Sequence, residues 1–111
     1  MNWRANSLDS LAMTDRDLRR IISHVCKAQG VRRLDLFGSR ARSPEREGRD
    51  YDFVATFEDL PPEEYSKRFF GLLHGLEDSL GEPVDLLTPQ SIHKESLKER
   101  IEKEKICVYE S

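Results

Sequence analysis

The stretch LFGSRARSPEREGRDYDF, residues 36–53, contains a glycine–serine turn and, ten residues later, two aspartates that stand one residue apart. Gly38 allows a sharp turn after a strand and lets the backbone approach a ligand closely. Ser39 would begin a short helix, where its hydroxyl and the free N–H groups of the first turn can bind a phosphate. The ordinary alternative is a strand-to-helix turn that Ser39 merely caps.

Asp50 and Asp52 are expected to project from one face of a strand, because residues i and i+2 of an extended chain point the same way. Two neighbouring carboxylates repel each other unless a cation lies between them, and magnesium prefers such oxygen ligands. Paired metal ions can hold the phosphates of an in-line phosphoryl or nucleotidyl displacement. The alternative is a polar strand face that is open to water.

A third aspartate, Asp85, lies in the segment PVDLL between aliphatic residues that favour a strand. Burying its carboxylate is costly unless the group is paired or bound to a metal. If this strand lies beside the one that carries Asp52, three carboxylates would gather opposite the glycine–serine turn. The alternative is an edge-strand aspartate that faces solvent.

The apolar residues elsewhere follow helical and strand periods in alternation. Their spacing predicts helices over 14–30, 38–43, 63–80 and 89–104, and strands over 31–37, 50–57, 83–88 and 105–110. The first two strands are expected to be antiparallel neighbours, and the long helix permits a crossover to the third. This order predicts an α/β (α+β) domain, with a small mixed sheet and flanking helices, over residues 13–111, preceded by an N-terminal arm over 1–12.

The 111 residues carry a net charge of −3, with 18 basic and 21 acidic side chains. Proteins that bind nucleic-acid backbones usually have a basic excess, so direct nucleic-acid binding is not expected. Residues 32–49 differ from the rest, with six arginines against three acidic residues. Such a basic segment suits a small polyanion such as a nucleoside triphosphate.

Cys26 and Cys107 are far apart and form no CxxC pattern, which favours two reduced, buried thiols over a disulfide. No apolar stretch approaches the length of a membrane span, and the N-terminus lacks a signal-peptide core. We therefore expect a soluble, cytoplasmic protein without membrane contact.

The combined pattern resembles the DNA polymerase beta-like nucleotidyltransferase superfamily, and more closely its minimal nucleotidyltransferase (MNT) branch. The residues that carry this resemblance are Gly38–Ser39, the ten residues 40–49, Asp50–Asp52 and the strand-embedded Asp85. The resemblance extends over about residues 14–110. The sequence departs from the family at two loop positions: Ser43 stands where glycine is often found, and Arg49 where serine is frequent.

The resemblance implies transfer of a nucleoside monophosphate, most often AMP from ATP, to an acceptor hydroxyl. Asp50 and Asp52 would hold two magnesium ions, and Asp85 would complete one metal site and act as general base. Gly38 and Ser39 would hold the triphosphate. In the same segment, two arginines, Arg40 and Arg42, would neutralise the pyrophosphate; surface solvation is the alternative for both.

The resemblance also implies a partner. Minimal nucleotidyltransferases are commonly antitoxins that adenylylate a tyrosine of a HEPN-family ribonuclease toxin, so a protein acceptor is expected here. One alternative is a non-catalytic antitoxin that neutralises its partner by binding. Nucleotidylation of a small molecule is a third interpretation, which the absence of sequence for an acceptor-binding domain disfavours.

Overall fold

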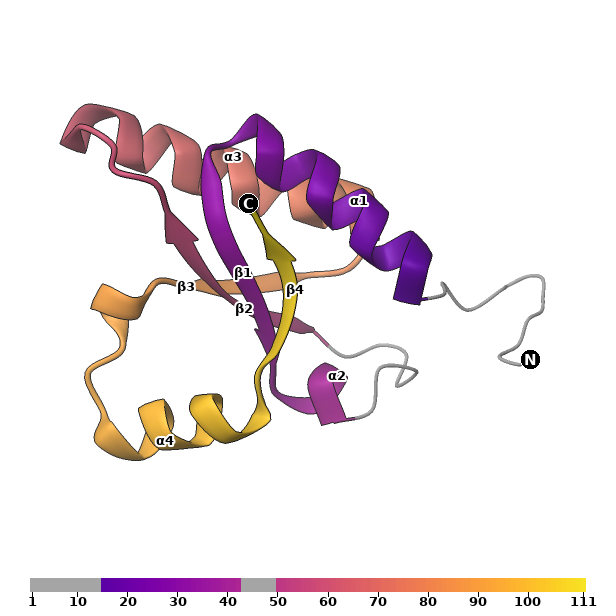
Figure 1. The fold of residues 1–111 in the computed structure, drawn as a ribbon, viewed down its shortest axis with the longest axis vertical. Coiled ribbons are helices and arrows are strands. Elements are labelled where there is room, and N and C mark those ends of the chain that lie inside the picture. Colours follow the sequence, from indigo (N-terminus) through magenta and orange to yellow (C-terminus); the bar gives the residue numbers. More distant parts are fainter. Residues whose placement is uncertain (1–14, 43–49) are drawn as a thin grey trace.

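The computed structural model describes residues 15–42 and 50–111, which form a four-stranded sheet with helices on both faces (Figure 1). The elements in chain order are α1 (Asp15–Ala28), β1 (Val31–Phe37), α2 (Ser39–Arg42), β2 (Tyr51–Phe57), α3 (Pro62–Leu80), β3 (Val84–Leu87), the 3-10 helix η1 (Pro89–Ser91), α4 (Glu95–Glu104) and β4 (Ile106–Glu110).

The sheet is mixed, with strand order β3-β2-β1-β4. Strand β1 pairs antiparallel with both β2 and β4, whereas β2 and β3 are parallel. A parallel neighbour requires a crossover connection, and α3 provides it. The predicted fold class, the antiparallel pairing of the first two strands and the placement of the third strand beside the second are all confirmed.

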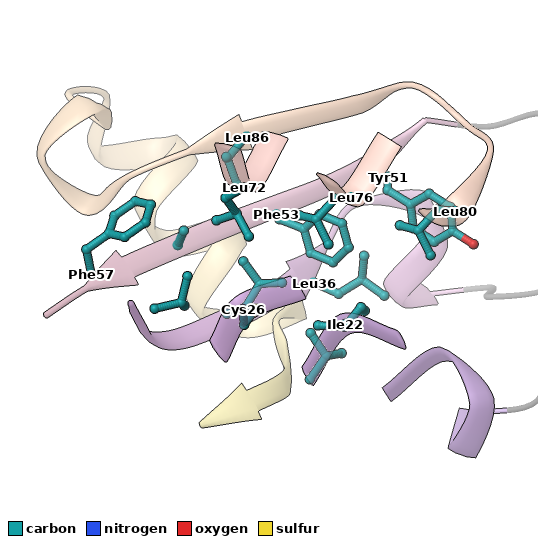
Figure 2. Close-up of a cluster of buried hydrophobic side chains, with 14 residues drawn as sticks. Ile22, Cys26, Leu36, Tyr51, Phe53, Phe57, Leu72, Leu76, Leu80 and Leu86 are labelled. Atoms are coloured by element: carbon teal, nitrogen blue, oxygen red, sulfur yellow. The ribbon is translucent and has the colours of Figure 1, made fainter. Parts of the chain in front are cut away.

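Helices α1 and α3 cover one face of the sheet and form the main core with it (Figure 2). Ile22 of α1 and Leu72 and Leu76 of α3 are fully buried, and they belong to the same cluster as Leu34 and Phe53 of the sheet. Helix α3 ends at Gly81, which has the left-handed φ of 70° that favours glycine after a helix.

A smaller apolar cluster lies on the opposite face of the sheet and holds α4 there. Phe37 and Val54 come from β1 and β2, and Ile92 and Ile101 come from the segment that follows β3. Residues 52, 54 and 56 of β2 alternate with its core-facing residues, so the face that α4 contacts is the face that carries Asp52.

The predicted helix over 89–104 is wrong in one respect, because it is interrupted. The hydroxyl of Ser91 donates to the carbonyl oxygen of Thr88 at 2.8 Å and accepts from the Thr88 N–H at 3.2 Å. These bonds close the 3-10 turn η1. Ile92 is then extended, with φ −95° and ψ 109°, and its side chain is buried in the smaller cluster before α4 begins at Glu95.

Other boundaries agree closely with the prediction, and β1 covers the predicted residues without change. Strand β2 begins at Tyr51, one residue after Asp50. The proposed arm over 1–12 and the start of the domain at residue 13 lie outside the described residues. In the part of the chain that the structure describes, no helix has the length and apolar character needed to span a membrane.

Both cysteines are free thiols, which confirms the absence of a disulfide between them. Cys26 is fully buried, and this burial raises the pKa of its thiol to about 12. Cys107 on β4 is only partly buried, so the prediction of two buried thiols is wrong for this residue. Because β4 is the last strand at one edge of the sheet, its side chains are covered less completely.

The two thiols should therefore differ in reactivity. We expect Ellman's reagent to modify Cys107 in the folded protein and to reach Cys26 only after unfolding, because the thiolate is the reactive form. Counting thiols with and without denaturant checks this, and a Cys107→Ser variant should show no rapid reaction. Rapid modification of both thiols in the folded protein would contradict the burial of Cys26.

Candidate active site

The glycine–serine turn connects β1 to the one-turn helix α2. Gly38 has a φ of 77°, and its carbonyl oxygen accepts hydrogen bonds from the N–H groups of Ala41 and Arg42 at 3.1 and 3.2 Å. A Cβ added at residue 38 would clash with Oδ2 of Asp52 and lie 3.2 Å from its Cγ. Glycine is thus favoured at residue 38 for two reasons: its positive φ and the close approach of the Asp52 carboxylate.

Asp52 and Asp85 lie opposite each other on the parallel strands β2 and β3. Side chains of directly paired residues project to the same face of a sheet, so both carboxylates face the side that α4 covers in part. Asp50 precedes the strand by one residue; it is exposed, as is Asp85, whereas Asp52 is half-buried. The sequence prediction that Asp85 joins Asp52 on one face is confirmed. The alternative, an edge-strand aspartate that faces solvent, also agrees with the structure, because β3 is an edge strand and Asp85 is exposed.

The electrostatics of Asp52 reflect this arrangement. Burial raises the pKa of its carboxyl above the ordinary value of 3.8, and the negative charges of Asp85 and Asp50 raise it further. The positive charge of Arg100, on α4, acts in the opposite direction. Two acidic groups therefore act on Asp52 at this end of the sheet, and one cation from α4 partly offsets their effect.

The chemistry of these carboxylates fits magnesium, because they are hard oxygen ligands whose mutual repulsion a divalent cation would remove. Within residues 15–42 and 50–111, however, no three acidic, histidine or cysteine side chains are arranged to hold a metal ion. Asp52 and Asp85 share one face of the sheet and Asp50 precedes the strand, but together they do not form a ready-made cage. Their assignment as metal ligands stays a prediction.

The two arginines of α2 have different surroundings. Arg40 is buried, its Nη1 donates to the Tyr51 hydroxyl at 3.0 Å, and its guanidinium carbon lies 4.1 Å from the centre of the Tyr51 ring. Surface solvation is therefore wrong for Arg40. Arg42 is exposed and pairs with Glu104 of α4 at 2.9 Å. A contact between either arginine and a phosphate stays a prediction.

Sequence reasoning missed the contribution of α4. Leu97 and Ile101, which are four residues apart, indicate its buried side in the sequence, and Ile101 is buried in the smaller cluster. Arg100 and Glu104 stand four residues apart beside that line, which is the spacing of neighbours on a helix surface. The sequence therefore shows that the two residues are neighbours on the helix. Only the fold shows that Arg100 acts on Asp52 and that Glu104 pairs with Arg42.

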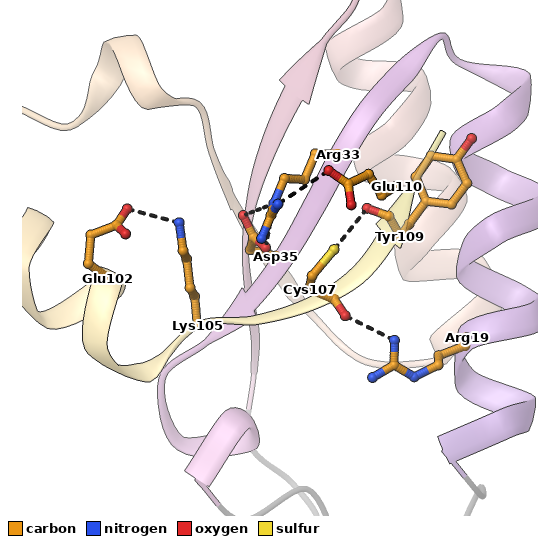
Figure 3. Close-up of polar contacts among 8 residues, drawn as sticks. All are labelled: Arg19, Arg33, Asp35, Glu102, Lys105, Cys107, Tyr109 and Glu110. Carbon is orange, nitrogen blue, oxygen red and sulfur yellow. Dashed lines mark hydrogen bonds and ion pairs between the residues drawn. The ribbon is translucent and has the colours of Figure 1, made fainter.

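Beyond the aspartates, the same sheet face carries a partly buried ion pair and a cavity. The guanidinium Nε of Arg33 lies 3.0 Å from Oδ1 of the buried Asp35, and its Nη1 lies 3.3 Å from Glu110 (Figure 3). A cavity of about 670 Å³ lies between this part of the sheet and α4, and Val54 contributes to its lining. Val54 follows Asp52 by two residues on the same face, but none of the three site aspartates lines the cavity.

Comparison with known proteins shows which protein family this chain belongs to. Residues 18–108 match the family described as nucleotidyltransferase domain. The chain belongs to this family and is a nucleotidyltransferase. The predicted resemblance to the nucleotidyltransferases is thereby confirmed.

Two relatives come from Methanocaldococcus jannaschii and are both named "Putative protein adenylyltransferase". MJ0435 is 34% identical over 99 residues, which cover 86% of this chain and 99% of the relative. MJ1379 is 37% identical over 78 residues, which cover 70% of this chain and 77% of the relative.

Solved structures show the same fold. One described as a putative minimal nucleotidyltransferase has a TM-score of 0.62 and 29% identity, covering 82% of this chain and 89% of that one. A complex of a tri-AMPylated Shewanella oneidensis HEPN toxin with its MNT antitoxin contains a chain with a TM-score of 0.61 and 17% identity, covering 88% and 74%. A chain of a toxin–antitoxin structure with AMP-PNP has a TM-score of 0.64 and 18% identity, and the match covers 84% of this chain and 73% of that one.

Proposed function

We propose that this protein is a magnesium-dependent adenylyltransferase that moves AMP from ATP to a hydroxyl of a partner protein. The observation that carries the proposal is that the glycine–serine turn and the carboxylates lie close together. Asp52 lies against Gly38 and opposite Asp85. A phosphate held at the turn would thus be next to the acidic groups. The names of the Methanocaldococcus jannaschii relatives support a protein acceptor.

In this proposal the N-terminus of α2, with Gly38 and Ser39, binds the triphosphate through backbone N–H groups and the serine hydroxyl. Arg42 is exposed, and it would exchange its ion pair with Glu104 for the pyrophosphate, for which a guanidinium fork is well suited. The structure engages Arg40 with Tyr51, so we leave Arg40 out of the phosphate contacts.

Asp50 and Asp52 would hold both magnesium ions, and Asp85 would complete one of the two sites. When bound, the magnesium ions supply positive charge that offsets the carboxylates and the phosphates. Asp85 also takes the proton of the acceptor hydroxyl as general base. The acceptor oxygen then bonds to the α-phosphorus of ATP, the bond from that phosphorus to the bridging oxygen breaks, and pyrophosphate leaves.

The partner we propose is a HEPN-family toxin, with a tyrosine as the acceptor and the cytoplasm as the compartment. The solved structures with this fold include a HEPN toxin that is AMPylated and bound to its MNT antitoxin. Incubating the chain with a HEPN protein, magnesium and ATP labelled at the α-phosphate tests the proposal. Label and the added mass of AMP are expected on a tyrosine of the HEPN protein, and the absence of label on any protein would contradict it.

The alternative is an antitoxin that acts by binding alone. The position of Asp85 opposite Asp52 on one face of the sheet, together with the exposure of Asp50 and Asp85, favours an active site. A double variant, Asp50→Ala with Asp52→Ala, separates the two functions. Loss of toxin neutralisation is expected if transfer is required, whereas full neutralisation would favour binding alone.

Magnesium should stabilise the folded protein at neutral pH, because a cation bound by the carboxylates removes the repulsion at Asp52. At a free concentration about ten times its Kd, one bound ion stabilises a protein by about 1.4 kcal/mol. For a domain of this size that raises Tm by roughly 5–10 °C. Thermal unfolding with and without magnesium measures the shift.

The control for the magnesium experiment is Asp78→Asn, which removes an exposed carboxylate of α3. This variant should keep the full magnesium shift, and Asp52→Asn should lose most of it. Equal shifts in the unchanged protein and in Asp52→Asn would place the bound magnesium elsewhere.

A further inference from the structure

We infer that Arg40 and Tyr51 act together as a positioning pair, which fixes the phosphate-binding turn relative to the strand that carries the site aspartates. This inference rests on the proposed function, because it assigns the pair a role in binding Mg·ATP. It gives Arg40 a different task from the phosphate contact that the sequence suggested.

The contact joins the two halves of the site directly. Arg40 is the second residue of α2, immediately after the Gly38–Ser39 turn. Tyr51 is the residue between Asp50 and Asp52. The 3.0 Å hydrogen bond and the cation–π contact at 4.1 Å therefore join a residue next to the turn to the residue between the two aspartates.

Both side chains are fixed in place by their surroundings. Tyr51 is 6% exposed and lies at one end of the main core, where its ring stacks on Phe53 with the two planes parallel to within 1° (Figure 2). Arg40 is also 6% exposed. A buried guanidinium is costly unless it is held by partners, so this geometry has little freedom to change.

Helix α2 needs such a contact. It has only four residues, and a single helical turn is not stable by itself in water. The orientation of its N–H groups must therefore come from tertiary contacts. Arg40 provides one through its planar fork, which bonds to the hydroxyl while the cation lies over the ring.

The position of the Arg40 guanidinium beside the Tyr51 side chain, which belongs to the main core, also distinguishes it from a phosphate ligand. Tyr51 and Asp52 are consecutive residues of β2, so their side chains point to opposite faces of the sheet. The Tyr51 ring lies on the face covered by α1 and α3, whereas Asp52 lies on the α4 face. A guanidinium bonded to the Tyr51 hydroxyl thus supports the turn from the core side.

A double-mutant cycle tests the inference through the Kd for Mg·AMP-PNP, measured by calorimetry without any acceptor protein. Tyr51→Phe keeps the ring and removes the hydroxyl, and we expect it to weaken binding about fivefold. Arg40→Met should weaken binding by about twentyfold, since small displacements at such sites have large effects. The double variant should bind like Arg40→Met alone, because the pair acts as one unit.

Arg40→Lys adds an independent test. Lysine keeps the positive charge but has no planar fork, so a positioning role predicts a loss close to that of Arg40→Met. A direct phosphate contact predicts near-normal binding by Arg40→Lys and by Tyr51→Phe. That result, or single effects that multiply in the double variant, would overturn the inference.

Matched controls separate positioning from general destabilisation. Tyr65→Phe removes a hydroxyl from another tyrosine packed against the core, and Arg68→Met removes a half-exposed arginine of α3. Both should bind Mg·AMP-PNP normally when measured well below the Tm of every variant. If the unchanged protein fails to bind Mg·AMP-PNP, the proposed function is at fault; if it binds and Tyr51→Phe binds equally well, only the positioning role fails.

Discussion

Asp52→Asn is expected to lower the rate of AMP transfer by about a thousandfold or more while leaving the protein at least as stable as before. Asparagine has nearly the same shape as aspartate, so the contact with Gly38 is kept. It cannot offer a charged ligand to magnesium. Activity and stability should therefore respond in opposite directions, which is typical of a residue placed for function.

The stability gain should depend on pH with a definite sign. The folded protein raises the pKa of the Asp52 carboxyl above its ordinary value of 3.8. Protonated Asp52 thus favours the folded state, and this contribution is complete below about pH 3.8 and is lost as the pH rises through the folded pKa. In metal-free buffer, Asp52→Asn should match the unchanged protein at acidic pH and exceed it in Tm at neutral pH.

Asp78→Asn again serves as the control, because it alters an exposed carboxylate on the other side of the sheet. It should change neither the transfer rate nor the pH dependence. Transfer by Asp52→Asn within a few fold of the unchanged rate would exclude Asp52 from the reaction. A neutral-pH Tm below that of the unchanged protein would show that its carboxylate stabilises the fold instead.

Much of the arrangement was predictable because local patterns and long-range packing agree. The alternation in 31–37 and 50–57 predicted two strands, although the second begins at Tyr51, so Asp50 precedes the strand instead of belonging to it. The strand around Asp85 was predicted from its aliphatic neighbours, and the parallel pairing then placed that aspartate opposite Asp52.

The features that could not be predicted depend on contacts between distant segments. Arginine is usually exposed, so nothing in the local sequence indicates that Arg40 is buried. Its burial depends on Tyr51, which is brought near only when β2 pairs with β1. In the same way, Arg100 acts on Asp52 only because Ile101 anchors α4 on that face of the sheet.

Gly38→Ala should have the second large effect, on both stability and transfer. Alanine at a φ of 77° is strained by roughly 1 kcal/mol or more. Its methyl group would also have to displace the Asp52 carboxylate, since it would clash with Oδ2. A shift of about 1 Å at a reacting group can reduce the rate about a hundredfold, so we expect a loss of that order in a protein with a lower Tm.

Gly81→Ala separates these two causes. Gly81 has a φ of 70°, but a Cβ there would have no atom within 4 Å. This variant should share the backbone strain and lower Tm by a comparable amount, while AMP transfer below its Tm stays normal. If Gly38→Ala transferred AMP as well as Gly81→Ala does, the close contact between the turn and Asp52 would have no part in catalysis.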